Sequence, residues 1–227
     1  MAKIVIKMGA QVFSQQQDNL ADIARDLHAL KKSGHEIILV HGGGVVIDES
    51  LKAAGITPQK KDGLRITDAA TMKVVQQVLD AVNADLSSKL TQLGLATHGF
   101  ASHNTVLAAT PACAIGLDGM EFDLGFVGSI ESVDTDAILS VLKDNGIPLI
   151  APLAFGVDGK LLFNVNADNV ASGIAEHINA DMLIFMSDVP GVIGANNIGV
   201  KTLRKAHCDH LTAVGTCLLY TSDAADE

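Results

Sequence analysis

Ile37-Ile38-Leu39-Val40-His41-Gly42-Gly43-Gly44, followed by Val45-Val46-Ile47-Asp48-Glu49-Ser50-Leu51, is the stretch of sequence that decides the fold. Four apolar residues in a row, three of them β-branched, predict a strand that is buried on both faces. The three glycines let the backbone turn sharply and approach a ligand closely, because no Cβ blocks the way. Apolar residues then recur at roughly helical spacing, so a helix is expected to begin at the glycines.

A strand, a glycine turn and a helix N-terminus in this order form a concavity of backbone N–H groups at the positive end of a helix dipole. Such a concavity suits an anion. Glycine triplets also occur in ordinary tight turns, so this stretch alone leaves both interpretations open.

The rest of the chain repeats the alternation of strand and helix. Ile4-Val5-Ile6 and the segments 147–150 and 182–186 predict further buried strands, and helix-like apolar spacing separates them. The region from Thr97 to Phe126 mixes short apolar runs with glycine and proline, which predicts several short strands. The predicted fold class is α/β, a three-layer αβα sandwich around an open, mainly parallel sheet.

Composition narrows the classes of function. The chain has 227 residues, 48% of them hydrophobic, which suits one large domain or two tightly joined lobes. Its net charge of −10 makes nucleic acid and anionic membranes poor partners. The apolar run at the start is too short for a signal peptide, and no run is long enough to span a membrane, so we expect a cytoplasmic protein.

No metal site is predicted. The three cysteines are odd in number and lack metal-ligand spacing, which suits reduced thiols. His207-Cys208-Asp209-His210 could suggest a metal site, but it lacks further ligands at known spacings.

The end of the chain differs in composition from the rest. Residues 217–227 look like the translated read-through of a sequencing adapter, and we expect them to be a non-native tail. A genuine acidic tail is the alternative. On the first interpretation, the natural sequence is interrupted near Thr216.

Polar residues follow the predicted strands at the points where these end. They are Lys7, His41 with its glycines, the run from Asn164 to Asp168, and Asp188. In open α/β sheets the carboxyl ends of the strands form the ligand crevice, so we expect these residues to gather there. Lys7 beside a glycine turn is well placed for a phosphate oxygen, although a surface lysine is the simpler interpretation.

Two further segments carry candidate polar groups. Asp62-Gly63 predicts a hairpin that carries Arg65, whose guanidinium matches a carboxylate, although an exposed arginine would need no such role. Asn164, Asn166 and Asp168 alternate, so an extended backbone would point all three to one side. An Asx turn with Asp168 as the N-cap of a helix is the alternative for that run, and both can hold together. His41 is interpreted as structural.

Five motifs follow one another along the chain: Lys7-Met8-Gly9, Val40-His41-Gly42-Gly43-Gly44, Gly63-Leu64-Arg65-Ile66-Thr67-Asp68, Asn164-Val165-Asn166-Ala167-Asp168 and Ser187-Asp188-Val189-Pro190-Gly191-Val192. Together they resemble the N-acetylglutamate kinases of the amino acid kinase family, and the similarity runs from Lys3 to about Thr216. The glycine triplet and the last motif are shared across the wider family, whereas the hairpin and the asparagine run are more specific to N-acetylglutamate kinases.

The resemblance implies a transferase that uses ATP with Mg²⁺ to phosphorylate the side-chain carboxylate of N-acetyl-L-glutamate in arginine biosynthesis. It implies that Lys7 stabilises the transferring phosphoryl group and that Asp168 orients the catalytic lysines. By the same resemblance, the substrate is bound by Gly43, Gly44, Arg65, Asn164 and Asn166. Nucleotide is expected at Lys7, Gly9, Asp188, Val189, Pro190, Gly191, Val192 and Ile193.

The resemblance also implies a division of the chain. Residues 1–175 would form an acetylglutamate-binding N-lobe and residues 176–216 part of a nucleotide-binding C-lobe. The family has a second catalytic lysine downstream of Thr216, so the chain as given is expected to bind N-acetylglutamate weakly at best and to turn over very slowly. Ala10 stands where the family usually has a glycine. In the family that this chain resembles, an N-terminal helical extension accompanies hexamers inhibited by arginine. The given sequence starts directly at its first predicted strand, so the resemblance implies a homodimer insensitive to arginine.

Two other functions stay open. One is a related kinase that acts on another acid, such as glutamate or an aminoadipate derivative. The other is a non-catalytic protein that binds an amino-acid derivative and has lost its ATP site.

Overall fold

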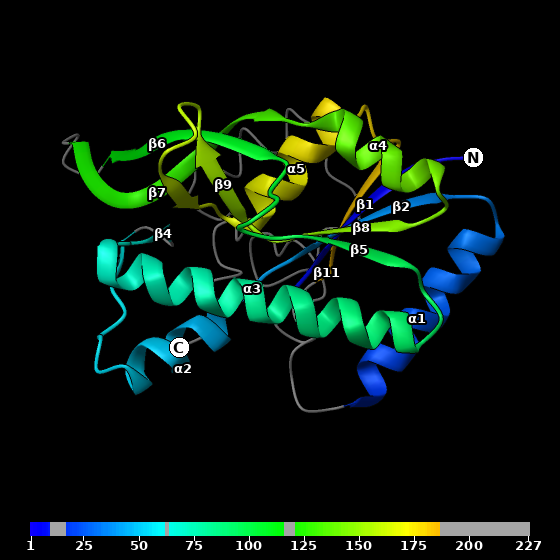
Figure 1. Ribbon diagram of the computed structural model, residues 1–227, viewed down its shortest axis with the longest axis horizontal. Helices are drawn as coiled ribbons and strands as arrows, with labels where there is room; N and C mark the ends of the chain where they lie inside the picture. The colour runs from blue at the N-terminus through cyan, green and yellow to red at the C-terminus, as the bar shows by residue number, and fades with distance from the viewer. Residues whose placement is uncertain (10–16, 62–63, 116–120, 187–227) are drawn as a thin grey trace, which may run out of the picture.

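The computed structural model describes residues 1–9, 17–61, 64–115 and 121–186 (Figure 1). Its strands are β1 (Lys3–Met8), β2 (Glu36–His41), β3 (Lys60–Lys61), β4 (Leu64–Arg65), β5 (Thr97–Phe100), β6 (Leu107–Ile115), β7 (Glu121–Val133), β8 (Ile147–Ile150), β9 (Leu153–Gly156), β10 (Leu162–Asn164) and β11 (Met182–Met186). Its helices are α1 (Gln17–Lys32), α2 (Gly44–Ala53), α3 (Ala69–Gln92), α4 (Thr135–Lys143) and α5 (Ala167–His177).

The central sheet has five strands in the order β11-β1-β2-β8-β5, and every pairing in it is parallel. Four strands predicted from apolar runs, β1, β2, β8 and β11, lie in this sheet. Parallel neighbours end at the same edge, so the residues that follow β1 and β2 are brought together there.

Helices cover both faces of the sheet, and Figure 1 shows α1 and α3 on one side and α4 and α5 on the other. Alternate residues of β1 separate in the same way. Ile4, Ile6 and Met8 pack in a core with α1 and α3, whereas Val5 packs in a second core with α4 and α5. The predicted three-layer α/β architecture is confirmed.

A second, smaller unit of structure is a closed barrel of β10, β7, β6 and β9. The prediction of several short strands between Thr97 and Phe126 was wrong for most of this region. β5 is short, whereas β6 and β7 are long antiparallel partners with two register shifts. The glycines and Pro111 suggested strand ends, but Pro111 lies at such a shift, where a ladder tolerates the missing N–H.

The strand β11 is less buried than its apolar sequence predicted. Met182 and Phe185 are 51% and 45% exposed. Among the described residues β11 pairs with β1 alone and lies at one end of the sheet, so part of its surface is left uncovered. Within the same described residues, no helix combines the length and the apolar character that crossing a bilayer requires.

Candidate active site

The glycine turn lies at the carboxyl edge of the sheet, between β2 and α2. Gly42 N donates to Met8 O at 3.2 Å, which ties the turn to the end of β1. Gly43 is the N-cap of α2 and carries no side chain that could bond the first N–H groups of the helix. A Cβ on Gly43 would lie 2.8 Å from the Leu79 Cδ2 of α3, so glycine lets the turn pack closely on that helix.

A buried polar pair supports the turn from below. His41 is fully buried, its Nδ1 lies 3.0 Å from Gly42 O, and its Nε2 lies 3.1 Å from the Asn83 Nδ2 of α3. A neutral ring with its proton on Nδ1 satisfies both contacts, by donating to Gly42 O and accepting from Asn83. Burial lowers the pKa of His41 to about 4, only partly opposed by the bond to Gly42. These contacts fit the structural role predicted for His41.

Lys7 is the second-to-last residue of β1 and lies at the carboxyl end of this strand. It has the same parity as Val5 and therefore faces the side of the sheet that α5 covers. Its Nζ lies 3.0 Å from the Asp168 Oδ1, and the two side chains are 12% and 26% exposed. Because α5 packs against β1 and β2, its first turn brings Asp168 to the end of the strand that carries Lys7.

The run from Asn164 to Asp168 is arranged differently from the prediction. Asn166, not Asp168, is the N-cap of α5, and its side-chain oxygen accepts from the N–H groups of Asp168 and Asn169 at 2.8 and 3.2 Å. The extended backbone ends at Asn164, the last residue of β10, so the three polar residues do not share one face of a strand. Capping at Asn166 leaves the Asp168 carboxylate available to Lys7.

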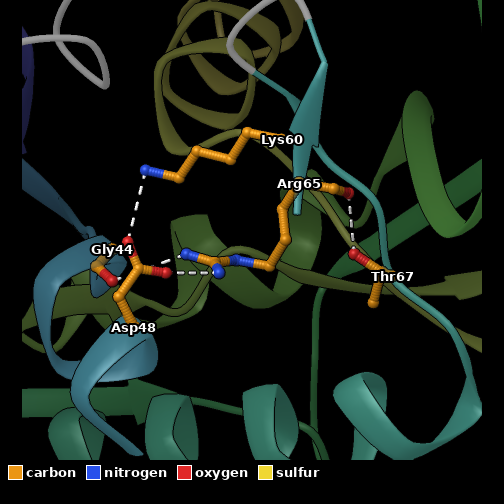
Figure 2. Close-up of polar contacts among 5 residues, drawn as sticks. All are labelled: Gly44, Asp48, Lys60, Arg65 and Thr67. Atoms are coloured by element: carbon orange, nitrogen blue, oxygen red, sulfur yellow. Dashed lines mark hydrogen bonds and ion pairs between the residues drawn. The ribbon is translucent and has the colours of Figure 1, made fainter. Parts of the chain in front are cut away.

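Arg65 is buried, not exposed, at 8% accessibility. Its Nη1 pairs with the Asp48 Oδ1 of α2, and its Nη2 makes a long 3.5 Å contact with Gly44 O. The Lys60 Nζ, on the opposite arm of the hairpin, lies 3.3 Å from the other Asp48 oxygen. Figure 2 shows the carboxylate of Asp48 between the two cations, beside Gly44.

The hairpin β3-β4 is fixed at its base by Thr67. The Thr67 Oγ1 donates to Arg65 O at 2.9 Å, and Phe126 N donates to Thr67 O at 2.7 Å. Gly125 of β7 has φ +71°, and a Cβ there would lie 2.2 Å from Thr67 O. This glycine therefore permits the close approach that holds the hairpin over the start of α2.

Lys7 and Arg65 are linked through the glycine turn by a continuous set of contacts. Asp168 holds Lys7, the strand of Lys7 bonds to the turn at Gly42, and the turn ends at Gly44, whose carbonyl meets Arg65. The site thus combines two positioned cations with the positive end of α2. Such an arrangement can bind a molecule with two negative groups and stabilise charge that develops between them.

Other predicted site residues are placed less directly. Gly9 N already donates to Met186 O at 3.1 Å, so this N–H is occupied within the sheet. Ala10 and the segment from Asp188 to Ile193 lie outside the described residues, as do His207 to His210. The described part of the chain holds no group of three or more His, Cys, Asp or Glu side chains that could bind a metal ion.

Asp48, Lys60 and Asn83 were not predicted as site residues from the sequence. For Asp48 and Lys60 a signal existed, because the hairpin register sets Lys60 directly opposite Arg65, and like charges in that position need an anion between them. Asn83 stands in an apolar stripe of α3, where a buried amide requires partners. Those partners come from three strands, so their position could not be read from the stripe.

Comparison with known proteins adds independent information. The model of a family described as "Amino acid kinase family" matches residues 2–223. The acetylglutamate kinase of Koribacter versatilis is 36% identical over 214 residues, which are 94% of this chain and 79% of that protein. The acetylglutamate kinase of Brevibacillus brevis is 37% identical over 207 residues, which are 89% and 73% of the two chains. The solved structure of smu.665 from Streptococcus mutans has a TM-score of 0.78 and 27% identity, covering 94% of this chain and 83% of that one.

Proposed function

The chain belongs to the amino acid kinase family, and from that premise we propose that it transfers the γ-phosphoryl group of ATP to the side-chain carboxylate of N-acetyl-L-glutamate. The product is N-acetylglutamyl phosphate, an intermediate of arginine biosynthesis. Relatives that are 36% and 37% identical to this chain over the aligned residues are named acetylglutamate kinases. The observation that carries the proposal is the glycine turn bounded by Lys7 on one side and Arg65 on the other.

The chemistry asks for positioned positive charge more than for a general base. A glutamate carboxyl has an ordinary pKa near about 4.3 and is already ionised at neutral pH, so it needs no deprotonation before attack. A carboxylate oxygen attacks the γ-phosphorus, the bond between the β,γ-bridging oxygen and that phosphorus breaks, and ADP leaves. Lys7 and the N–H groups of Gly43 and Gly44 offset the repulsion between the two anions and the charge that builds on the phosphoryl oxygens.

The substrate has two carboxylates, and the site has two places for them. The side-chain carboxylate, which reacts, is placed beside Lys7, and Lys7 also contacts the phosphate oxygens of ATP. The α-carboxylate then falls to Arg65, whose planar guanidinium can hold it with two parallel hydrogen bonds. Asn164 at the end of β10 supplies an amide near the middle of the substrate, and the side-chain N–H₂ of Asn166, whose oxygen caps α5, is a further donor.

ATP and Mg²⁺ fit the residues that are described. Lys7 is a single compact charge at a strand end beside glycines, which suits a phosphate oxygen. Because Mg²⁺ is commonly held by substrate phosphates and only one or two carboxylates, the ion is expected to arrive with the nucleotide. Asp168, which pairs with Lys7, is the carboxylate that the described residues offer beside this lysine. When bound, Mg²⁺ would neutralise charge on the β- and γ-phosphates.

The proposal includes a division of labour along the chain. Residues 1–175 carry the acid site, and residues 176–216 contribute to the nucleotide site. The enzyme is proposed to be a cytoplasmic homodimer. Sedimentation of the purified chain tests the last point, and a monomer at micromolar concentration would contradict it.

Transfer of labelled phosphate tests the function. The chain is incubated with γ-labelled ATP, Mg²⁺ and N-acetyl-L-glutamate, and hydroxylamine traps the acyl phosphate as a hydroxamate. We expect hydroxamate with N-acetyl-L-glutamate and much less with L-glutamate or N-acetyl-aminoadipate. Preference for one of the other acids would indicate a related kinase. Binding of the acid with no trapped product, even after long incubation, would favour a non-catalytic binding protein.

A further inference from the structure

The hairpin places two positive charges directly opposite each other. Lys60 and Arg65 are paired residues of the two arms, and like charges in that relation destabilise a hairpin. Both reach the same carboxylate, since the Lys60 Nζ lies 3.3 Å from the Asp48 Oδ2 and Arg65 pairs with the Asp48 Oδ1. Asp48 is therefore the group that allows both cations to stand on this hairpin.

Asp48 also controls the direction of the guanidinium. One terminal nitrogen of Arg65 is taken by Asp48 and the other touches Gly44 O, so the plane of the fork is set by α2 and not by the flexible arginine side chain. Arg65 is 7% and Asp48 is 20% exposed as side chains, so solvent screens this pair less than a surface pair. The remaining donors of the fork stay available for an incoming carboxylate.

Charge balance explains why a second cation is present. A carboxylate paired with Arg65 alone would cancel the charge of the arginine and leave little attraction for an anion. Lys60, at 30% exposure, adds a positive charge to the same carboxylate. The cluster of Asp48, Lys60 and Arg65 then carries one net positive charge beside the positive end of α2.

We propose that Asp48 is a positioning residue of the acid site and orients Arg65 toward the α-carboxylate of the substrate. Lys60 keeps the cluster positively charged, so that it attracts the substrate carboxylate. The identity of the bound acid rests on the proposed function. The orientation of Arg65 by Asp48 rests on contacts within the chain alone.

The substitution Asp48→Asn separates positioning from charge. It removes a negative charge from the site, so an account based on charge alone expects tighter binding of an acid. The positioning account expects the opposite, because the guanidinium loses the partner that orients it. Calorimetry measures the Kd of N-acetyl-L-glutamate and of its α-amide, which lacks the carboxylate assigned to Arg65.

We expect the parent chain to prefer the acid over the α-amide and Asp48→Asn to reduce that preference about tenfold, on the scale of a lost charged hydrogen bond. Lys60→Met is expected to weaken acid binding about threefold, as for a partly exposed ion pair, and Lys60→Arg to restore it. Asp85→Asn is the matched control, because Asp85 pairs with Lys89 on an exposed part of α3. An unchanged or increased preference in Asp48→Asn overturns the proposal.

A second measurement needs no substrate. Urea unfolding of Asp48→Asn, Arg65→Met and the double variant gives the coupling between the two side chains. We expect the double variant to unfold at a higher urea concentration than the sum of the single shifts implies, and additive shifts would overturn the positioning role. If the parent chain binds no N-acetyl-L-glutamate while the coupling is present, the proposed function fails and the positioning of Arg65 stands.

Discussion

The two cations of the site are held in different ways, although each is paired with a carboxylate from a helix. Lys7 belongs to β1, which has hydrogen-bonded neighbours on both sides, and its partner Asp168 stands in the capped first turn of α5. Arg65 belongs to a hairpin with two residues in each strand, and its partner Asp48 is shared with Lys60. The sheet positions the first cation, whereas side-chain contacts position the second.

This difference has a consequence for function. A group fixed by the central sheet has few alternative positions, which suits stabilisation of a transition state, where small displacements cost rate. A group oriented by an ion pair that leaves some of its donors unused can hold an incoming carboxylate with those donors, which suits binding of a substrate. Substitutions near Lys7 should therefore change kcat, and substitutions near Arg65 should change KM.

The largest effect is expected from Lys7→Met. Removal of one positioned donor to developing charge typically costs about 10² to 10³ in kcat, and we expect a loss of that size with little change in the KM for N-acetyl-L-glutamate. Methionine retains the apolar length of the side chain, so thermal unfolding should stay close to that of the parent. Transfer of labelled phosphate measures the rate. Lys160→Met, at an exposed turn, is the control, and a similar kcat for both variants would remove Lys7 from the reaction.

A second prediction concerns His41, which supports the glycine turn between Lys7 and Arg65. The folded chain keeps His41 neutral, with a pKa of about 4, whereas an exposed histidine has an ordinary pKa near 6.5. Between about pH 4 and 6.5, His41 is therefore protonated in the unfolded chain and neutral in the folded chain. The contribution of neutral His41 to the free energy of unfolding is fully present above about pH 6.5. It is lost as the pH drops toward 4, and the total loss is about 3 kcal/mol. Urea unfolding across this range measures the loss.

Substitution identifies the histidine responsible. His41→Gln is expected to lower stability at neutral pH and to remove most of the pH slope, because the amide does not titrate. The same change at the exposed His98 should leave the slope as in the parent. A slope that survives in His41→Gln would assign the pH dependence to carboxylates elsewhere.

The sequence predicted the parts of this site that depend on local chemistry. The strand of Val40, the glycine turn and the Asp62-Gly63 hairpin follow from apolar runs and from turn residues, and the structure has β2, the turn and β3-β4 at these places. The burial of Arg65 could not be predicted in this way. It depends on α2 and on the approach of Thr67 to Gly125, which are far apart in the sequence.

The same limit explains the misassigned cap of α5. Asp168 and Asn166 are both good N-cap residues, and propensity does not separate them. Tertiary contact does, because Lys7 attracts the carboxylate of Asp168 and leaves the cap to the neutral amide. A sequence that contains two suitable caps thus needs the position of a distant lysine before the choice is clear.

The smallest predicted effect decides how Asn166 acts. Asn166→Ala removes an N-cap and should cost about 1 kcal/mol of stability. If the loss of the cap displaces Asp168 and the whole free energy appears in the activation barrier, kcat falls about fivefold with an unchanged KM. If instead the amide of Asn166 touches the substrate, the KM for N-acetyl-L-glutamate rises. Asp134→Ala, which removes the cap of α4 away from the site, is the matched control, since it should cost similar stability and change neither constant. A fall in kcat confined to Asn166→Ala would mean that the cap helps to position Asp168, and through it Lys7, so that the rigid side of the site extends beyond the sheet into α5.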